Sequence, residues 1–162
     1  VEMCAPNSVI IHDIAKGNFP VPDGSFDVVF NKSIIEHLHN PEVMLEEASR
    51  ILRKDGLIIT MCPSWVHTGW GPFYLDHTHV TPFTLPSLRD IHLKNGFEVV
   101  EICHFRQLPL LWRYSWLKLF TEIIRKLPIP YSPQNQISFS GNMNKVVRFS
   151  NEVMLLCIAR RI

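Results

Sequence analysis

Two short groups of acidic and histidine side chains are the part of this sequence best suited to chemistry. Glu36 and His37 are adjacent, and His77 and His79 follow in a later segment. Histidine titrates near neutral pH and can accept or donate a proton, so His37 and His79 are candidate bases or acceptor-orienting residues. A histidine that stabilises its turn by bonding to backbone is the competing interpretation for His37.

Aromatic side chains precede the second histidine group. Trp65 and Tyr74 lie in the segment from Pro63 to Pro82, which also contains His77. Aromatic walls with a few polar groups are typical of a small-molecule pocket, so we expect Trp65, Tyr74 and His77 to contact a substrate. The alternative is that the large aromatics only hold a long loop in place.

The elements that must position these residues follow an α/β order. The apolar run Phe26 to Phe30, after Asp23-Gly24, predicts a buried parallel strand. A helix should begin at Pro41 with Asn40 as its cap and end at Gly56 in a left-handed conformation. Flanking strands are expected at Ser8 to His12 and from Leu57 to Met61.

The second half of the chain predicts a helix, two strands and an intervening amphipathic segment. The expected helix runs from Thr84 to Asn95, and the expected strands are Phe97 to Phe105 and Glu152 to Arg160. Between the strands, Leu110 to Leu127 has apolar residues at helical spacing. Gln134 to Ser150 is polar and is expected to be irregular.

The order of these motifs resembles the class I S-adenosylmethionine-dependent methyltransferases, in the type 11 and ubiquinone-pathway-like group. The motifs that carry the resemblance are Asp13, Pro22 to Asp27, Glu36-His37-Leu38, Arg50 to Gly56, and the later Asp76 to Thr84. The resemblance covers about residues 8 to 105 and the last strand. It implies an α/β fold with a Rossmann-like, mostly parallel sheet whose last strand is antiparallel.

The same resemblance implies a cofactor and places it. The cofactor is S-adenosyl-L-methionine, and the family's acidic residue after its third strand, here Asp13, bonds to the adenine amino group while Ile14 packs on the ring. Asn31, Lys32 and Ser33 occupy the end of the next strand, where the family holds the amino acid portion of the cofactor. The implied reaction is methyl transfer to a small-molecule acceptor, such as a sugar or a quinone-like metabolite.

A metal site is the alternative for the histidine groups. One small-RNA methyltransferase group binds a divalent cation through Glu-x-x-Glu-His and a later histidine, but Ser33 stands at the first glutamate position here. Glu36, His37, His77 and His79 still have suitable oxygen and nitrogen donors. Because the pattern is broken, we predict no metal.

The glycine-rich loop that follows the family's first strand has no counterpart in this sequence. Its seven glycines are scattered, and none forms a Gly-x-Gly after a strand. We therefore expect residues 1–162 to be a single partial methyltransferase domain, the C-terminal portion of a longer protein or a damaged copy, with an insertion at about 106–150. The rival hypothesis is a non-catalytic methyltransferase-like module that binds a partner or a membrane surface.

Charge and cysteine content limit the partners and the setting. The net charge of +1 gives no reason to expect nucleic acid binding. The four cysteines have no Cys-x-x-Cys spacing, so we expect free thiols in a reducing, cytoplasmic environment, although Cys103 and Cys157 could face each other on paired strands. The basic, tryptophan-containing segment from Leu110 to Leu127 predicts peripheral membrane contact as one use of the insertion, packing as a lid or on a dimer mate as another.

Overall fold

The computed structural model describes residues 9–69, 73–129 and 141–162. Its centre is a four-stranded sheet with the strand order β1-β2-β4-β3. The strands are β1 (Phe26–Lys32), β2 (Leu52–Pro63), β3 (Phe97–Phe105) and β4 (Met154–Arg161). β1 pairs in parallel with β2, while β4 is antiparallel to both β2 and β3. This confirms the predicted α/β fold with an antiparallel last strand.

Two helices cover one face of the sheet. These are α1 (Pro41–Ile51) and α3 (Leu85–Lys94). Leu45 and Ala48 from α1 and Leu88 from α3 join one buried cluster with inward side chains of β2 and β4. Apolar residues three and four apart thus face the sheet, as helical periodicity requires.

In the described part of the chain, β1 has a neighbouring strand on one side only, and several of its apolar side chains are exposed. β1 is an edge strand, and Phe26, Val28 and Phe30 are between 38% and 60% exposed. The prediction that this strand is buried is therefore wrong, although its parallel pairing is confirmed.

The strand expected at Ser8 to His12 is not formed in the described residues. Val9 to His12 have no strand assignment, and the side chains of Val9 and Ile11 are almost fully exposed. A strand needs a neighbour for its backbone hydrogen bonds, and the described sheet ends at β1. Asp13 instead begins a short 3₁₀ helix, η1 (Ile14–Lys16), where its side chain accepts a hydrogen bond from the Ala15 amide.

The expected left-handed cap at Gly56 is also wrong. α1 ends at Ile51, and β2 begins at the next residue. The pairing of Phe26 with Leu52 jumps to Val28 with Leu57, so the intervening residues of β2 bulge out. Asp55 has the positive φ of 63°, while a Cβ on Gly56 would lie 2.9 Å from the Arg53 carbonyl oxygen. Glycine is required there for close backbone approach rather than for helix termination.

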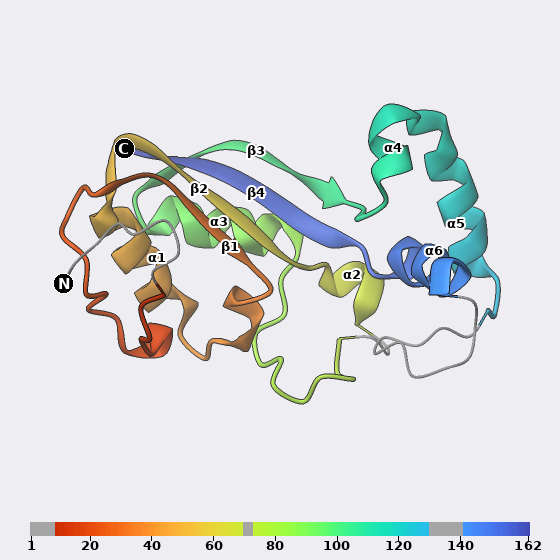
Figure 1. Cartoon of the computed structure of the whole chain (residues 1–162), viewed down its shortest axis with the longest axis horizontal. Helices are drawn as coiled ribbons and strands as arrows, with labels where there is room; N and C mark the ends of the chain where they lie inside the picture. Colours follow the sequence, from red (N-terminus) through yellow and green to blue (C-terminus); the bar gives the residue numbers. More distant parts are fainter. Residues whose placement is uncertain (1–8, 70–72, 130–140) are drawn as a thin grey trace.

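A helical segment between β3 and β4 lies at one end of the sheet (Figure 1). It contains α4 (Pro109–Arg113), η3 (Ser115–Leu117), α5 (Lys118–Lys126) and α6 (Gly141–Asn151). The single helix expected from Leu110 to Leu127 is therefore interrupted at Tyr114. Irregular structure was expected from Gln134 to Ser150, but α6 occupies most of this range. Residues 134–140 lie outside the described part. Cys62, Cys103 and Cys157 are free thiols, as predicted.

Arg50 ties the segment before β1 to α1. Its guanidinium donates to the carbonyl oxygens of Phe19 and Val21 and to the carboxylates of Asp23 and Glu47. Glu47 also accepts a hydrogen bond from the Phe19 amide at 2.7 Å. The Arg50 hydrogen bond holds the pKa of the Glu47 carboxyl below its usual value.

Replacing Arg50 by Lys should destabilise the fold. An ammonium group has no planar fork and cannot keep these hydrogen bonds, so the free energy of unfolding should fall by about 1–3 kcal/mol in urea titrations. Arg53→Lys is the matched control, since Arg53 makes one exposed ion pair with Asp27. That variant should change stability by less than about 1 kcal/mol. Equal losses in the two variants would contradict the assigned role of Arg50.

Candidate functional site

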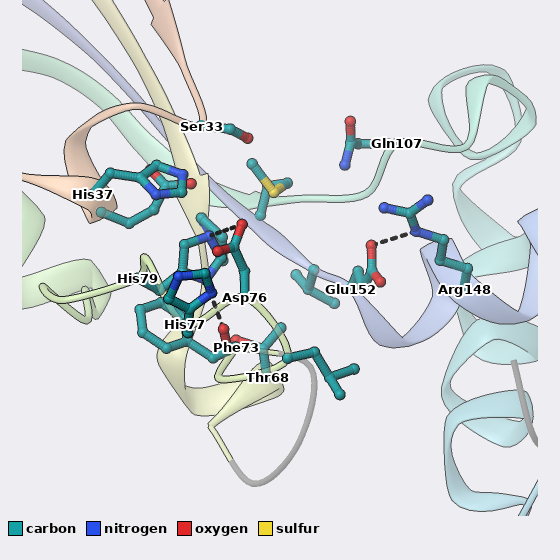
Figure 2. Close-up of a pocket in the computed structure, with 15 residues that line it drawn as sticks. Ser33, His37, Thr68, Phe73, Asp76, His77, His79, Gln107, Arg148 and Glu152 are labelled. Atoms are coloured by element: carbon teal, nitrogen blue, oxygen red, sulfur yellow. Dashed lines mark hydrogen bonds and ion pairs between the residues drawn. The ribbon is translucent and has the colours of Figure 1, made fainter. Parts of the chain in front are cut away.

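A pocket of about 500 Å³ lies at the carboxyl ends of β1 and β2. Ser33 directly follows β1 and Pro63 ends β2, and both line the pocket. Open α/β sheets place their ligands at this edge. Figure 2 shows His37, Asp76 and His79 gathered on one wall, with Arg148 and Glu152 across the cavity.

A strained turn at Ser33 directs the chain into this site. Ser33 has a positive φ of 54°, which costs a non-glycine residue of the order of 1 kcal/mol. Its amide donates to the Met61 carbonyl oxygen on β2, which fixes the turn to the neighbouring strand. The next element, η2 (Ile35–His37), then presents Glu36 and His37 to the pocket.

The loop after α2 (Trp65–Thr68) is anchored to η2 by backbone hydrogen bonds. The carbonyl oxygen of Glu36 accepts from the amides of Val80 and Thr81, at 2.9 and 3.0 Å. The Thr81 hydroxyl donates to the Leu38 carbonyl oxygen. These bonds bring the rings of His37 and His79 to a centroid distance of 4.6 Å, so the structure places the two predicted catalytic residues together.

The opposite wall contains residues that the sequence analysis missed. Arg148 of α6 donates to Glu152 at 2.7 Å, and both side chains line the pocket with Gln107. Burial raises the pKa of Glu152, and Arg148 offsets part of that effect. The available signal was the four-residue spacing of Arg148 and Glu152, which suits an ion pair on a helix. Arg148, however, lies within the polar segment that was expected to be irregular.

Glu36, which the sequence suggested only for the rejected metal site, also lines the pocket. Its side chain is completely buried, and neither carboxylate oxygen has a hydrogen-bond partner among the described residues. Burial raises the pKa of this carboxyl group above its usual value. Buried acids are normally hydrogen-bonded or paired, so this carboxyl group requires an explanation.

The aromatic residues predicted to bind substrate have a visible structural role. Trp65 makes edge contacts with Phe73 and Tyr74, with ring centroids 5.3 and 5.6 Å away. Phe73 and His77 line the pocket, whereas Trp65 and Tyr74 are not among its lining residues. This arrangement supports the loop-holding alternative for Trp65, and substrate contact by Trp65 and Tyr74 stays a prediction.

The predicted cofactor residues divide between two cavities. Ile14 and Asn31 line a second, mostly apolar pocket of about 320 Å³, while Ser33 lines the first. The side-chain nitrogen Nδ2 of Asn31 donates to the Thr60 hydroxyl. The side-chain oxygen Oδ1 of Asn31 is buried without a partner in the described structure. Asp13 is half-exposed and pairs with Lys16, and Lys32 donates to Gln107.

The fold and the position of the pocket define the class to which the chain is related. The mixed α/β sheet with an antiparallel last strand, and the pocket at the carboxyl ends of β1 and β2, are the features by which this chain resembles the class I S-adenosylmethionine-dependent methyltransferases. The family model "Methyltransferase domain" matches residues 3–60. The resemblance indicated by the motifs is thereby confirmed, and S-adenosylmethionine is the cofactor of this class.

Individual relatives agree. A probable S-adenosylmethionine-dependent methyltransferase of Mycobacterium tuberculosis is 31% identical over 98 residues, which are 57% of this chain and 34% of that protein. A Haloferax volcanii protein solved with the Trm112 methyltransferase activator has a TM-score of 0.61 at 18% identity, covering 93% of this chain and 60% of its own. Haemonchus contortus phosphoethanolamine N-methyltransferase 2, solved with S-adenosylhomocysteine, has a TM-score of 0.51 at 15% identity, covering 92% and 36%. The chain spans about a third of the length of the curated relatives it matches.

A buried polar network beneath the site predicts acid sensitivity. His92 lies on α3, fully buried, and its ring bonds to the Leu88 carbonyl oxygen and the Thr60 hydroxyl. Burial lowers the pKa of His92 below its ordinary 6.5, so the unfolded chain takes up a proton first as pH falls. The free energy of unfolding should be fully expressed above pH 6.5 and should decline below it.

Urea titrations between pH 7 and pH 5 would measure this dependence. His92→Gln should show a smaller decline than the wild type, whereas His39→Gln, at an exposed position, should not. Part of the decline should remain, because burial also lowers the pKa of His67, to about 4, and that of His104. An unchanged slope in His92→Gln would contradict the assignment.

Proposed function

We propose that the protein containing this chain transfers a methyl group from S-adenosylmethionine to a small-molecule acceptor, such as a sugar, a quinone-like compound or another metabolite. The observation that carries the proposal is the pocket beside Ser33, where a polar wall with two histidines faces a cavity of about 500 Å³. This volume is within the range of small-molecule sites. The fold and the relatives supply the reaction type.

The two cavities suggest how donor and acceptor are arranged. Asn31 and Ile34 line the apolar pocket with Ile14, whereas Ser33 and Glu36 line the polar one. In this proposal the adenine lies against Ile14 near Asp13, and the backbone of Asn31 to Ser33 contacts the amino acid portion. The sulfonium methyl group then points past Ser33 toward the acceptor.

Alignment is the main requirement of the proposed reaction. The acceptor's nucleophilic atom bonds to the methyl carbon as the carbon–sulfur bond breaks, and the bonding electrons remain on sulfur in S-adenosylhomocysteine. Holding the two reactants in line supplies much of the rate, and no covalent enzyme intermediate is needed. His37 or His79 would orient the acceptor and accept its proton, since both rings line the cavity.

Calorimetric titration with S-adenosylhomocysteine tests the cofactor assignment. Asp13→Ala should weaken binding about fivefold to tenfold, the lower end for losing one hydrogen bond, because Asp13 is half-exposed. Asp90→Ala, at an exposed position on α3, is the matched control and should bind like the wild type. If Asp13→Ala and the wild type bound S-adenosylhomocysteine with equal affinity, the proposed role of Asp13 would be wrong. If neither this chain nor an upstream-extended form bound S-adenosylhomocysteine, with each shown to be folded, the non-catalytic module would be favoured.

We also propose that α4, η3 and α5 contact an anionic membrane surface. Trp112, Trp116 and Leu119 are each more than 60% exposed, and Phe120, Ile123 and Leu127 are also exposed. Arg113, Lys118 and Lys126 are exposed in the same segment, whereas Glu122 is paired with Arg106. Aromatic and basic side chains together suit an interfacial helix. None of the helices in the described ranges is long and apolar enough to cross a membrane.

Co-sedimentation with phosphatidylcholine vesicles, with and without phosphatidylserine, tests this contact. The chain should bind the anionic vesicles, and a Trp112→Ala, Trp116→Ala variant should bind roughly tenfold less, because it loses two large apolar groups. Leu93→Ala, an exposed apolar residue on α3, is the control and should bind normally. Absent vesicle binding, with dimers found by light scattering, would assign the face to a second copy instead.

A further inference from the structure

Three side chains around the strained turn form a compact group of metal-binding donors. Glu36, His37 and His79 each offer one ligand atom, and these atoms all lie within 4.8 Å of one another. Glu36 and His37 come from η2, and His79 comes from the loop anchored to it. The broken motif in the sequence argued against a metal, yet this grouping does not involve the Ser33 position.

The hydrogen bonds fix which ring nitrogen of each histidine is free. The Nδ1 of His79 lies 2.7 Å from the Phe73 carbonyl oxygen, which only accepts, so this nitrogen carries the proton. The Thr78 hydroxyl donates its one proton to Asp76 and must therefore accept from Nδ1 of His37, at 2.8 Å. In the neutral form each ring therefore keeps an Nε2 lone pair, and the Nε2 of His79 lies 3.9 Å from Oδ2 of Asp76, beyond hydrogen-bond distance. Metal-binding histidines are typically oriented in this way by a carbonyl or by a carboxylate network.

Glu36 provides an independent second observation. Its carboxyl group is fully buried against the cavity wall, with no hydrogen bond to either oxygen in the described structure. A buried carboxylate without hydrogen bonds is costly unless it is neutralised or binds a cation. The imidazoles of His37 and His79 lie beside this carboxyl group. A metal cation is therefore the partner that could bind to all three side chains.

We propose that Glu36, His37 and His79 bind a divalent first-row transition metal ion, with Zn²⁺ as the best match. Two neutral imidazoles and one carboxylate are a donor set that zinc accepts, and Mg²⁺ and Ca²⁺ prefer oxygen ligands alone. All three residues line the pocket, so a remaining coordination position would be open to a ligand from it. This site does not depend on the proposed methyl transfer; with the ion bound, both Nε2 lone pairs would be used, so His37 and His79 would no longer serve as the proton acceptor.

Binding of Zn²⁺ alone to the metal-free chain, measured by calorimetry, tests the site. One equivalent should bind, and Mg²⁺ at the same concentration should not compete. Glu36→Gln and His79→Ala should each weaken binding by more than about tenfold, and Thr78→Val should weaken it about 10- to 100-fold through the orientation of His37. His39→Ala, which removes an exposed histidine two positions from His37, should bind Zn²⁺ like the wild type.

Co²⁺ provides a readout that surface binding would not imitate. A low-symmetry site with nitrogen ligands should give visible absorption bands that disappear in His79→Ala and persist in His39→Ala. Glu36→Gln is isosteric with the protonated acid and should fold, which urea unfolding would verify. Zn²⁺ binding of equal strength in Glu36→Gln, His79→Ala and wild type would overturn the proposal and assign the ion to surface histidines.

Discussion

The candidate site depends on one backbone acceptor. The carbonyl oxygen of Glu36 takes hydrogen bonds from both Val80 and Thr81, and these bonds join η2 to a loop that is distant in the sequence. Two side-chain hydrogen bonds, from Thr81 to the Leu38 carbonyl oxygen and between His37 and Thr78, reinforce this link and keep His79 beside His37. Because the contacts of the Glu36 carbonyl oxygen are main-chain, they specify the position of the loop while leaving the side chains of Glu36, His37 and His79 available for chemistry.

The turn at Ser33 is the other half of this constraint. Its left-handed backbone is unfavourable for serine, and the surrounding hydrogen bond to Met61 and the burial of Ile35 and Glu36 maintain it. Strain of this kind is concentrated where a fold positions a ligand. The polar network of Asn31, Thr60 and His92 lies under the same strand end, so the site rests on a rigid, hydrogen-bonded base.

Helices cover one face of the sheet, whereas the edge strand β1 exposes apolar side chains beside the apolar pocket. α1 and α3 seal one face, whereas the β1 edge exposes Val28 and Phe30. The segment from Ile10 to Val21 lies against part of this exposed region without forming a strand, and the apolar pocket lies between them. Arg50 stabilises that segment by bonding to its carbonyl groups, which replaces the support that a neighbouring strand would give.

The helical segment between β3 and β4 contributes to the site and to the surface. α5 packs on α6, and α6 delivers Arg148 to the pocket wall, while the apolar side chains of Leu119 and Ile123 remain exposed. A helix with an apolar side that faces outward is not explained by the core of this domain. The same helical segment therefore lines the pocket on one side and exposes apolar side chains on the other.

Local patterns in the sequence were sufficient for the elements that bury a periodic face. Strand β3 was predicted with its observed bounds, α3 and β4 within two residues, and α1 with its observed start, because alternation and helical spacing record burial directly. The motifs also indicated the family and singled out His37 and His79 as candidate catalytic residues, although not their contact with each other. Tertiary structure decided three other features. Val9 to His12 have no strand to pair with in the described structure, and Gly56 lies in a bulge. The carboxyl group of Glu36 is buried without a hydrogen-bond partner among the described residues. Each of these depends on neighbours far away in the chain, which local periodicity does not encode.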